Sequence, residues 1–471
     1  MHGPRITDAA TPVDTATLLK ADQEHLIHPL HHPVDHAEPL IYVRGRGAIV
    51  QDIAGNEYID GLSGLWNVNV GHGRAELADA AAAQMKELAY CSGYIGSSSI
   101  PAITLANRLL DIAYDNMQAV FFTSGGAESN ESAFKTARFY WKALGRPDKV
   151  KVVARDQGYH GLTLQAMSAT CMGNTSWKMF EPRVPGFVHI QTCYPYRYQG
   201  ARPDESVGRA AARELEEALL REGPDTVAAF IAEPIHGAGG VIYPDDDYWP
   251  RVREVCTRYD VLLIADEVIT GFCRTGRWFA LSHWDVKPDI VTFAKGVTSG
   301  YLPLGGIMVT RAIKEVMDSV KPGDRWAHAY TYSGHPTCCA VALRNIEIME
   351  REGLCENAAR MGTRLLAGLA AAFGDHPNIG DIRGGKGLLA AVEFVEDPET
   401  KRNFDTARKV ASRLQAEMKT RGVITRGRAA VGPHPAPGDA LFFAPPLVVT
   451  EAEVDRLVSV AHDSARVVLG S

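Results

Sequence analysis

The sequence has no long hydrophobic run and no excess of positive charge. None of its apolar stretches approaches the roughly 20 residues that a helix needs to cross a bilayer, so no membrane span is expected. The 49 lysines and arginines against 56 aspartates and glutamates give a net charge of −7, without a long basic run. This distribution argues against nucleic-acid binding. Residues 1–25 carry charges throughout and contain no apolar signal core, which predicts a cytoplasmic protein.

Several cofactor and metal motifs are also missing. The glycine motifs of dinucleotide and nucleoside-triphosphate sites, G-x-G-x-x-G and G-K-[ST], do not occur. The eight cysteines form no C-x-x-C pair and stand in apolar or mixed surroundings, so we expect buried free thiols. Five histidines crowd residues 25–36, but the prolines between them would organise metal ligands poorly. We therefore predict no metal site and interpret this segment as an arm lying over another part of the molecule, with metal binding as the alternative.

The sequence does contain an alternation of short apolar runs and helical stretches. Apolar runs of strand length occur at 151–155, 228–235, 261–268, 289–296 and 304–310. Alternation of this kind predicts a mostly parallel sheet covered by helices on both faces. Residues 48–66 alternate around an Ala-Gly-Asn turn, which predicts a β-hairpin, and the Gly/Pro-rich stretch 426–440 predicts an inserted loop.

Polar residues and glycines stand where these strands end. Ligands of open α/β sheets bind at the carboxyl ends of the strands, so these positions are the candidate site. The residues found there are Ser124, Gly125, Gly126, Ala127, Tyr159, His160, Glu233, Asp266, Glu267 and Lys295.

Lys295 and Asp266 carry the strongest chemical signal. Lys295 ends the apolar run "IVTFAKG", and a desolvated lysine has a lowered pKa and a neutral amine that can form a Schiff base with a carbonyl. A lysine that only reaches toward solvent is the alternative. Successive strand residues alternate between faces, so Asp266 and Val268 share one face while Glu267 takes the other. We expect Glu267 to pair with Arg274.

An acid and a valine on one strand face suit the ring of pyridoxal phosphate. Asp266 could keep the ring nitrogen protonated, and Val268 could pack against the ring. In "FFTSGGAESNE" the glycines between strand and helix would direct backbone N–H groups at a phosphate. Tyr159 in "DQGYHG" could stack on the other ring face, with an ordinary core aromatic as the alternative.

Together, the motifs resemble those of the class III (omega) aminotransferases, which are fold-type-I pyridoxal phosphate enzymes. The resemblance rests on "FFTSGGAESNESAFKTAR", "YHG", "AEPIHGAGG", "LLIADEVITGFCRTG", "TFAKG" and "TYSGHP", and runs from about residue 40 to the C-terminus. It implies an α/β fold whose large domain has a mostly parallel seven-stranded sheet sandwiched by helices, plus a smaller α+β domain from both termini. The expected segments are 1–75 (arm and part of the small domain), 76–340 (large cofactor-binding domain) and 341–471 (the rest of the small domain).

The resemblance also implies roles for individual residues. The cofactor-binding residues it implies are Ser124, Gly125, Gly126, Ala127, Tyr159, His160, Glu233, Asp266, Val268, Lys295 and Thr331. Lys295 would form the internal aldimine with pyridoxal 5'-phosphate, and Asp266 would partner the pyridinium nitrogen. Thr331 would reach the phosphate bound by a neighbouring subunit, so a homodimer with active sites at the interface is expected, with a tetramer as the alternative. The family usually has a hydroxyl side chain in the phosphate turn, and its absence here predicts somewhat fewer phosphate contacts.

The expected activity is a ping-pong transfer of an amino group from a primary amine or omega-amino acid to a keto acid, with pyruvate the expected acceptor. The substrate-binding residues that the resemblance implies are Trp66, Tyr94, Tyr159 and Arg426. Their aromatic lining favours small or apolar amines, and paired guanidinium N–H groups suit a keto-acid carboxylate. Arg428 is the alternative to Arg426. A decarboxylating aminotransferase or an aminomutase on the same scaffold is the alternative activity.

Overall fold

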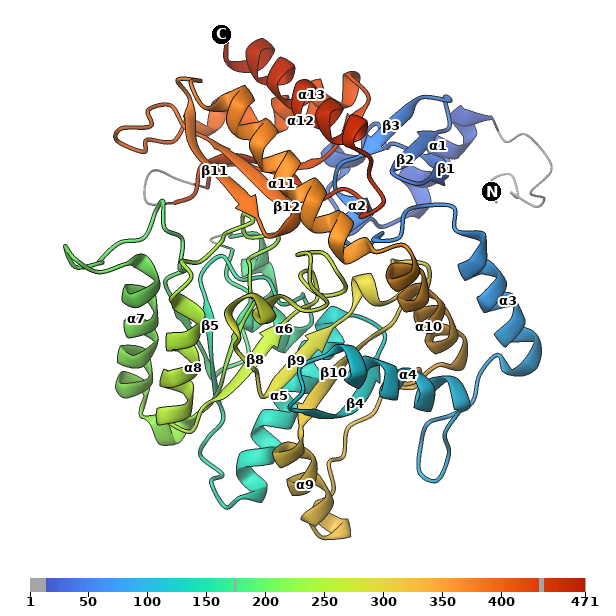
Figure 1. Cartoon of the computed structure of the whole chain (residues 1–471), viewed down its shortest axis with the longest axis vertical. Coiled ribbons are helices and arrows are strands. Elements are labelled where there is room, and N and C mark those ends of the chain that lie inside the picture. The colour runs from blue at the N-terminus through green and yellow to red at the C-terminus, as the bar shows by residue number, and fades with distance from the viewer. Residues whose placement is uncertain (1–13, 173–174, 432–435, 471) are drawn as a thin grey trace.

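The computed structural model describes residues 14–172, 175–431 and 436–470. Figure 1 shows a lower part built around a sheet and an upper part that contains segments from both ends of the chain. None of the helices in the described residues is long and apolar enough to span a membrane.

A seven-stranded sheet forms the centre of the lower part. Its strands are β4 (Met117–Thr123), β5 (Lys151–Arg155), β6 (Phe187–Ile190), β7 (Val227–Ala232), β8 (Leu262–Asp266), β9 (Ile290–Phe293) and β10 (Gly305–Thr310). Their order across the sheet is β4-β10-β9-β8-β7-β5-β6. Only β10 is antiparallel to its neighbours, and the pairs from β9 through to β6 are parallel. The predicted mostly parallel sheet is confirmed.

Helices cover both faces of this sheet, which explains why its strands are apolar on both sides. In β8, Leu262 and Ile264 belong to one core together with α5 (Gly126–Ala143) and α9 (Arg311–Ser319). Leu263 and Ala265 belong to a larger core on the other side. The helices on that side are α4 (Ile100–Ile112), α7 (Val207–Glu222), α8 (Tyr248–Arg258) and α10 (Pro336–Arg351). The same alternation directs the last residue of β8, Asp266, to the α5 side.

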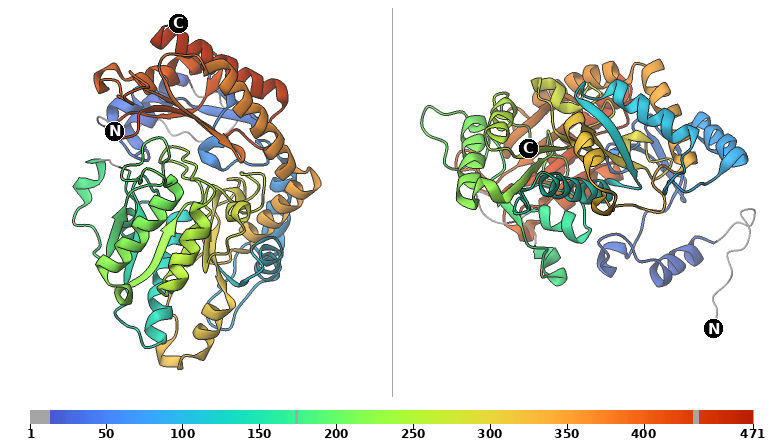
Figure 2. Two further views of the ribbon diagram at one scale, coloured as in Figure 1. Left: turned by 60° about the vertical axis from the view of Figure 1, so that its left-hand side comes forward. Right: turned by 90° about the horizontal axis from the view of Figure 1, so that it is seen from below.

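The two ends of the chain together build the upper part, as Figure 1 and the left view of Figure 2 show. One four-stranded sheet contains β1 (Tyr42–Arg46), β2 (Ile49–Asp52), β3 (Glu57–Asp60) and β13 (Val423–Ile424). The other contains β11 (Ile379–Gly385), β12 (Gly387–Phe394), β15 (Asp439–Phe443) and β14 (Arg426–Arg428). The helices of the upper part are α11 (Leu354–Phe373), α12 (Val410–Thr420) and α13 (Glu451–Leu469). The antiparallel β2–β3 pair is the predicted hairpin, and β13 pairs in parallel with β3, which joins the two ends of the chain.

Two predictions about the chain's elements and cysteines are wrong. The predicted loop 426–440 begins with the edge strand β14, which pairs with Ala440–Phe442, and ends inside β15; residues 432–435 lie outside the described part. Cys273 and Cys355 form a disulfide rather than remaining free thiols. They are 82 residues apart, and only folding brings the start of α11 against the segment after β8.

The histidine-rich segment lies near α1 (Thr15–His25). The rings of His28 and His36 stack with centroids 3.9 Å apart, and Pro33–His36 forms a single 3-10 turn. Among the described residues, no group of three or more histidine, cysteine or carboxylate side chains is arranged to hold a metal ion.

Candidate active site

Lys295 and Asp266 stand side by side at the carboxyl edge of the large sheet. Asp266 ends β8, and Lys295 follows the end of the neighbouring parallel strand β9 with a left-handed φ of 46°. That backbone turn directs the lysine into the interior. Burial lowers the pKa of Lys295 to about 8, although the Asp266 and Glu233 carboxylates partly oppose the shift. A substantial share of the amine is therefore neutral near physiological pH, as a Schiff-base lysine requires.

The Asp266 carboxylate is only 3% exposed and is held from three sides. Its Oδ2 accepts a hydrogen bond from Asn130 Nδ2 at 2.9 Å and lies 2.7 Å from His160 Nδ1. Its Oδ1 accepts the backbone N–H of Val268 at 3.2 Å. The sequence analysis missed Asn130. The signal was in the phosphate motif, because Asn130 lies one helical turn beyond Gly126 on α5 and so shares its face.

Glu267 points to the opposite side of the sheet, as predicted, but it does not pair with Arg274. Its carboxylate accepts hydrogen bonds from Tyr114 Oη at 2.5 Å, from the Thr270 hydroxyl and from Leu281 N at 3.2 Å. Burial raises the pKa of Glu267. The expected pairing is wrong because Phe272 and Cys273 both adopt left-handed backbone, which turns the chain before Arg274.

The turn between β4 and α5 forms a cradle at a helix N-terminus. Gly125 is the N-cap of α5 and Gly126 is its first residue. A Cβ atom at Gly126 would lie 2.9 Å from Val268 Cγ1, so glycine is needed for Val268 to pack against this turn. Around Gly125 the space is open. The backbone N–H of Ser124 is already bound by Glu128 Oε2 at 2.6 Å, which leaves the following N–H groups for an anion.

Tyr159 and Glu233 form a second wall. The Tyr159 backbone N–H donates to Glu233 Oε1 at 3.0 Å, and Gly237 N donates to Oε2 at 2.7 Å. Burial raises the pKa of Glu233. The next residue of the Tyr-His-Gly motif, His160, contacts Asp266, and a Cβ at Gly161 would lie 2.5 Å from Ala127 Cβ. This motif therefore connects the phosphate turn with Asp266.

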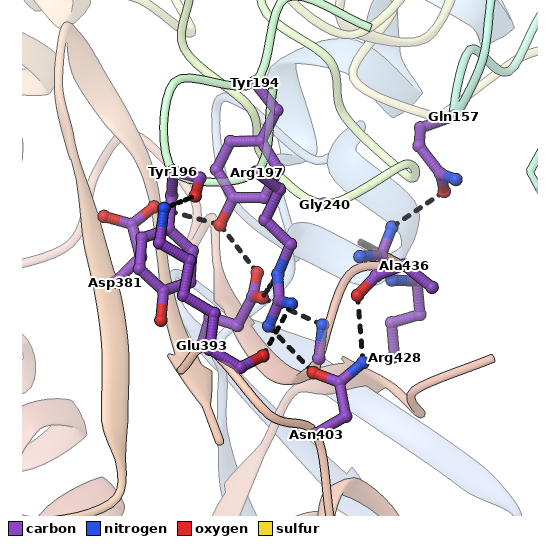
Figure 3. A network of polar contacts seen from close by, with 12 residues as sticks. Gln157, Tyr194, Tyr196, Arg197, Gly240, Asp381, Glu393, Asn403, Arg428 and Ala436 are labelled. Atoms are coloured by element: carbon purple, nitrogen blue, oxygen red, sulfur yellow. Dashed lines mark hydrogen bonds and ion pairs between the residues drawn. The ribbon is translucent and has the colours of Figure 1, made fainter. Parts of the chain in front are cut away.

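Trp66 and Arg426 come from the two ends of the chain and meet beside Lys295. The Lys295 Nζ lies 5.5 Å from the centre of the Trp66 ring, and the Arg426 guanidinium carbon lies 5.8 Å from the same ring. The alternative, Arg428, is directed away to Gln157 Oε1 at 3.2 Å, as Figure 3 shows, within the view of the polar network around Glu393. It also donates to the Gly239 carbonyl. Arg428 therefore points away from Lys295, toward Gln157 and Gly239, which leaves Arg426 as the arginine beside Lys295.

Two of the expected site residues are not brought to this place within one chain. The Tyr94 side chain is 53% exposed, and Thr331 is exposed in the loop before α10, where its carbonyl accepts a hydrogen bond from Tyr90 Oη at 2.9 Å. Within the described residues, no contact joins either of them to Lys295 or Asp266.

The model of the class III aminotransferases matches residues 31–464. The chain belongs to this family. A diaminobutyrate–2-oxoglutarate transaminase from Halomonas elongata is 40% identical over 453 residues, which are 94% of each chain. A putrescine–pyruvate aminotransferase from Pseudomonas aeruginosa is 40% identical over 90% of this chain and 89% of that protein. The omega transaminase from Pseudomonas jessenii, solved in complex with PMP, superimposes with a TM-score of 0.89 at 38% identity, covering 96% of this chain and 99% of that one.

The enzyme is thus an aminotransferase that uses pyridoxal 5'-phosphate, and the donor set described above fits that cofactor. A neutral amine suits the aldehyde, a buried carboxylate suits a protonated ring nitrogen, and the start of α5 suits a phosphate. A side chain at position 126 would collide with Val268, so the glycine there leaves the start of α5 open to a phosphate.

Proposed function

We propose that this aminotransferase moves an amino group from a primary amine or omega-amino acid to a keto acid, with pyruvate as the acceptor, and that Lys295 is its catalytic amine. The observation that carries the proposal is the placement of Lys295, with its lowered pKa, beside the hydrogen-bonded carboxylate of Asp266. Relatives named for putrescine with pyruvate and for diaminobutyrate with 2-oxoglutarate support the reaction class.

When bound, pyridoxal phosphate supplies an electron sink that stabilises a carbanion on the amine-bearing carbon. The Lys295 Nζ, whose pKa burial lowers to about 8, would take the proton from that carbon as a base and then deliver it, as an acid, to the former aldehyde carbon of the cofactor. The Asp266 carboxylate would hold a proton on the ring nitrogen. Asn130 and His160 hold the Asp266 carboxylate in place for this. Tyr159 and Val268 would enclose the ring, and the N–H groups at Gly126 and Ala127 would bind the phosphate.

Arg426 would bind the carboxylate of the keto acid, and Trp66 would form the wall against the amine substrate. A guanidinium that lies over the face of Trp66 can leave that ring at little cost when a carboxylate arrives. A carboxylate forms paired N–H···O bonds with it, whereas an uncharged amine substrate leaves it on the ring.

The test begins with the visible spectrum of the cofactor-loaded protein. Alanine, β-alanine, putrescine, taurine and 1-phenylethylamine are added in turn, and pyruvate or 2-oxoglutarate is then used to restore the band. Bleaching by an amine and recovery with pyruvate would support the proposal, and recovery only with 2-oxoglutarate would correct the acceptor. A band that no amine bleaches would refute transamination in favour of the decarboxylating or aminomutase alternative.

We further propose a homodimer in which Thr331 and Tyr94 of one copy complete the site of the other. The exposure of both side chains, away from their own Lys295, supports this arrangement. Co-expression of a Lys295→Ala chain with a Thr331→Ala chain tests it. In mixed dimers one site would have both residues intact and regain activity. If Thr331 served its own chain, both sites would remain impaired and mixing would restore nothing.

A further inference from the structure

Arg274 is fully buried, and within the described residues its guanidinium contacts no carboxylate. Its four acceptors are neutral oxygens: the carbonyls of Leu388 (3.1 Å) and Pro445 (2.7 Å), Ser63 Oγ (2.8 Å) and Asn69 Oδ1 (2.7 Å). Burial lowers the pKa of Arg274 to about 9, although the Asp60 carboxylate partly opposes the shift. A buried charge with no carboxylate in direct contact is costly, so its position calls for a reason beyond packing.

The four acceptors lie in segments far apart in the chain. Leu388 is in β12 of the C-terminal sheet, and Pro445 lies in the segment that directly follows β15 of that sheet. Ser63 and Asn69 stand on either side of Trp66. The Arg274 guanidinium therefore joins the C-terminal sheet to the short segment that carries Trp66.

That segment has a backbone that needs support. Ser63 and Trp66 both adopt left-handed φ values, 48° and 56°, which residues with a side chain rarely do. The Ser63 hydroxyl donates to the Ala444 carbonyl while it accepts from Arg274. Trp66 Nε1 is buried without a hydrogen-bond partner among the described residues, so its own polar atom does not fix the ring. Packing against Phe442 and the larger core, together with the held backbone on either side, fixes it instead.

Asn69 extends the same support to the catalytic lysine. Its Nδ2 donates to the Phe272 carbonyl at 2.7 Å while its Oδ1 accepts from Arg274. A Cβ at Gly296, the residue after Lys295, would lie 2.6 Å from Asn69 Nδ2. One guanidinium thus supports both the Trp66 segment and the side chain against which the Lys295 turn packs.

We propose that Arg274 is a positioning residue that sets the place of the Trp66 ring relative to Lys295, and that it thereby decides which amines fit the pocket. The claim that Arg274 decides which amines fit rests on the proposed function. The claim that Arg274 sets the position of the Trp66 ring does not, because it concerns only contacts within this chain.

Fluorine NMR of the apoprotein labelled with fluorotryptophan tests the ring position without any turnover. The chain has seven tryptophans, and Trp66→Phe identifies the signal of Trp66. Arg274→Lys keeps the charge but loses the planar fork, and Ser63→Ala removes one acceptor while leaving Arg274 in place. Arg197→Lys is the matched control, because Arg197 is another buried arginine, bound to Glu393 and Asn403 instead.

We expect the Trp66 signal to shift or broaden in Arg274→Lys and in Ser63→Ala, and to stay in place in Arg197→Lys even if that variant melts at a lower temperature. The ratio of kcat/KM for 1-phenylethylamine to that for alanine should change by about tenfold in the first two variants and not in the control. An unmoved Trp66 signal in both variants would overturn the proposal, and a moved signal with an unchanged ratio would overturn its selectivity part. Failure of the proposed function would show differently, as a wild-type protein that converts neither amine.

Discussion

Lys295 and Asp266 differ from Trp66 and Arg426 in the structure that holds them. The first two stand at the ends of adjacent parallel strands in one sheet, β9 and β8, whose residues are buried. The second two come from opposite ends of the chain, from α2 (Ser63–Trp66) and from the edge strand β14. Asp266 is held by Asn130 of the covering helix α5 and by His160 in the loop after β5, whereas the segment that carries Trp66 is bound through Ser63 to Arg274 and to the Ala444 carbonyl.

With the roles proposed above, this difference separates the residues of the chemistry from those that choose the substrate. A proton-transfer site needs fixed geometry, and paired strands of a buried sheet supply it. A substrate wall built from chain ends can change its shape without moving the sheet. Changes at Lys295 and Asp266 should therefore reduce turnover for every substrate, and changes at Trp66 or Arg426 should act on particular substrates.

Lys295→Ala should have the largest effect. Without its amine, the reaction loses the base and the acid at the substrate carbon, and turnover should fall by about 10⁴-fold with every amine. The visible band of the loaded protein should also disappear. The matched control is Lys149→Met, because Lys149 is also buried with a pKa lowered to about 8, but it precedes β5 and donates to the Pro224 carbonyl at 2.9 Å. A retained band in Lys295→Ala would mean that another lysine is the catalytic one.

Asp266→Asn should come next. The variant should bind the cofactor but lose about 10²- to 10³-fold in turnover, because an amide cannot hold the ring nitrogen protonated. Glu267→Gln is the control on the neighbouring residue. Its carboxylate faces Tyr114 and Leu281, so we expect a lower melting temperature with an unchanged cofactor spectrum. Near-wild-type turnover in Asp266→Asn would remove the electrostatic role of this carboxylate.

Arg426→Ala should affect only half of the reaction. Loss of a charge-assisted hydrogen-bond pair costs roughly 1.5–3 kcal/mol, so the KM for the keto acid should rise about 10- to 100-fold. Bleaching of the loaded protein by 1-phenylethylamine should proceed at nearly the wild-type rate, because this amine has no carboxylate. Stopped-flow measurement of the two half-reactions separates the outcomes, and equal losses in both would place Arg426 with the chemistry instead.

The smallest effect should be a shift in pH dependence. In the apoprotein, the rate of cofactor uptake should rise with pH through a midpoint near 8, the pKa of the Lys295 amine, and level off once the amine is fully neutral. Removing a negative charge lowers the pKa of an amine, so Asp266→Asn should move this midpoint downward, and Arg426→Ala should move it upward. A midpoint near that of an ordinary lysine, about 10.4, would show that burial does not shift Lys295.

The same group should affect the stability of the apoprotein in a defined direction. The pKa of Lys295 is lower in the folded protein than in an unfolded chain, where it is about 10.4. Between these values the unfolded chain binds more protons, so the contribution of Lys295 to folding free energy becomes more favourable as pH rises from about 8 to about 10.4. Comparison of wild type with Lys295→Met by urea unfolding at the two ends of this range measures it.

Much of the fold and of the chemical centre could be predicted from the sequence. The apolar runs identified the strands. Lys295 and Asp266 follow or end two of these strands, and parallel neighbours end at the same edge of a sheet, so the sequence predicted that the two side chains lie close together. The alternation along β8 also predicted which way Asp266 and Glu267 point. Asn130 could have been found on the same grounds, one turn after the phosphate glycines.

Other contacts could not be predicted because nothing local encodes them. The disulfide, the partners of Arg274 and the meeting of Trp66 with Arg426 each join residues from distant segments. The sequence by itself determined the strand–helix order and the chemistry at the strand ends, since hydrophobic periodicity and glycine turns act over a few residues. Only the tertiary structure decided where Arg274 goes and how the two chain ends meet over the sheet, because a buried guanidinium binds whichever carbonyls the packed domains bring to it.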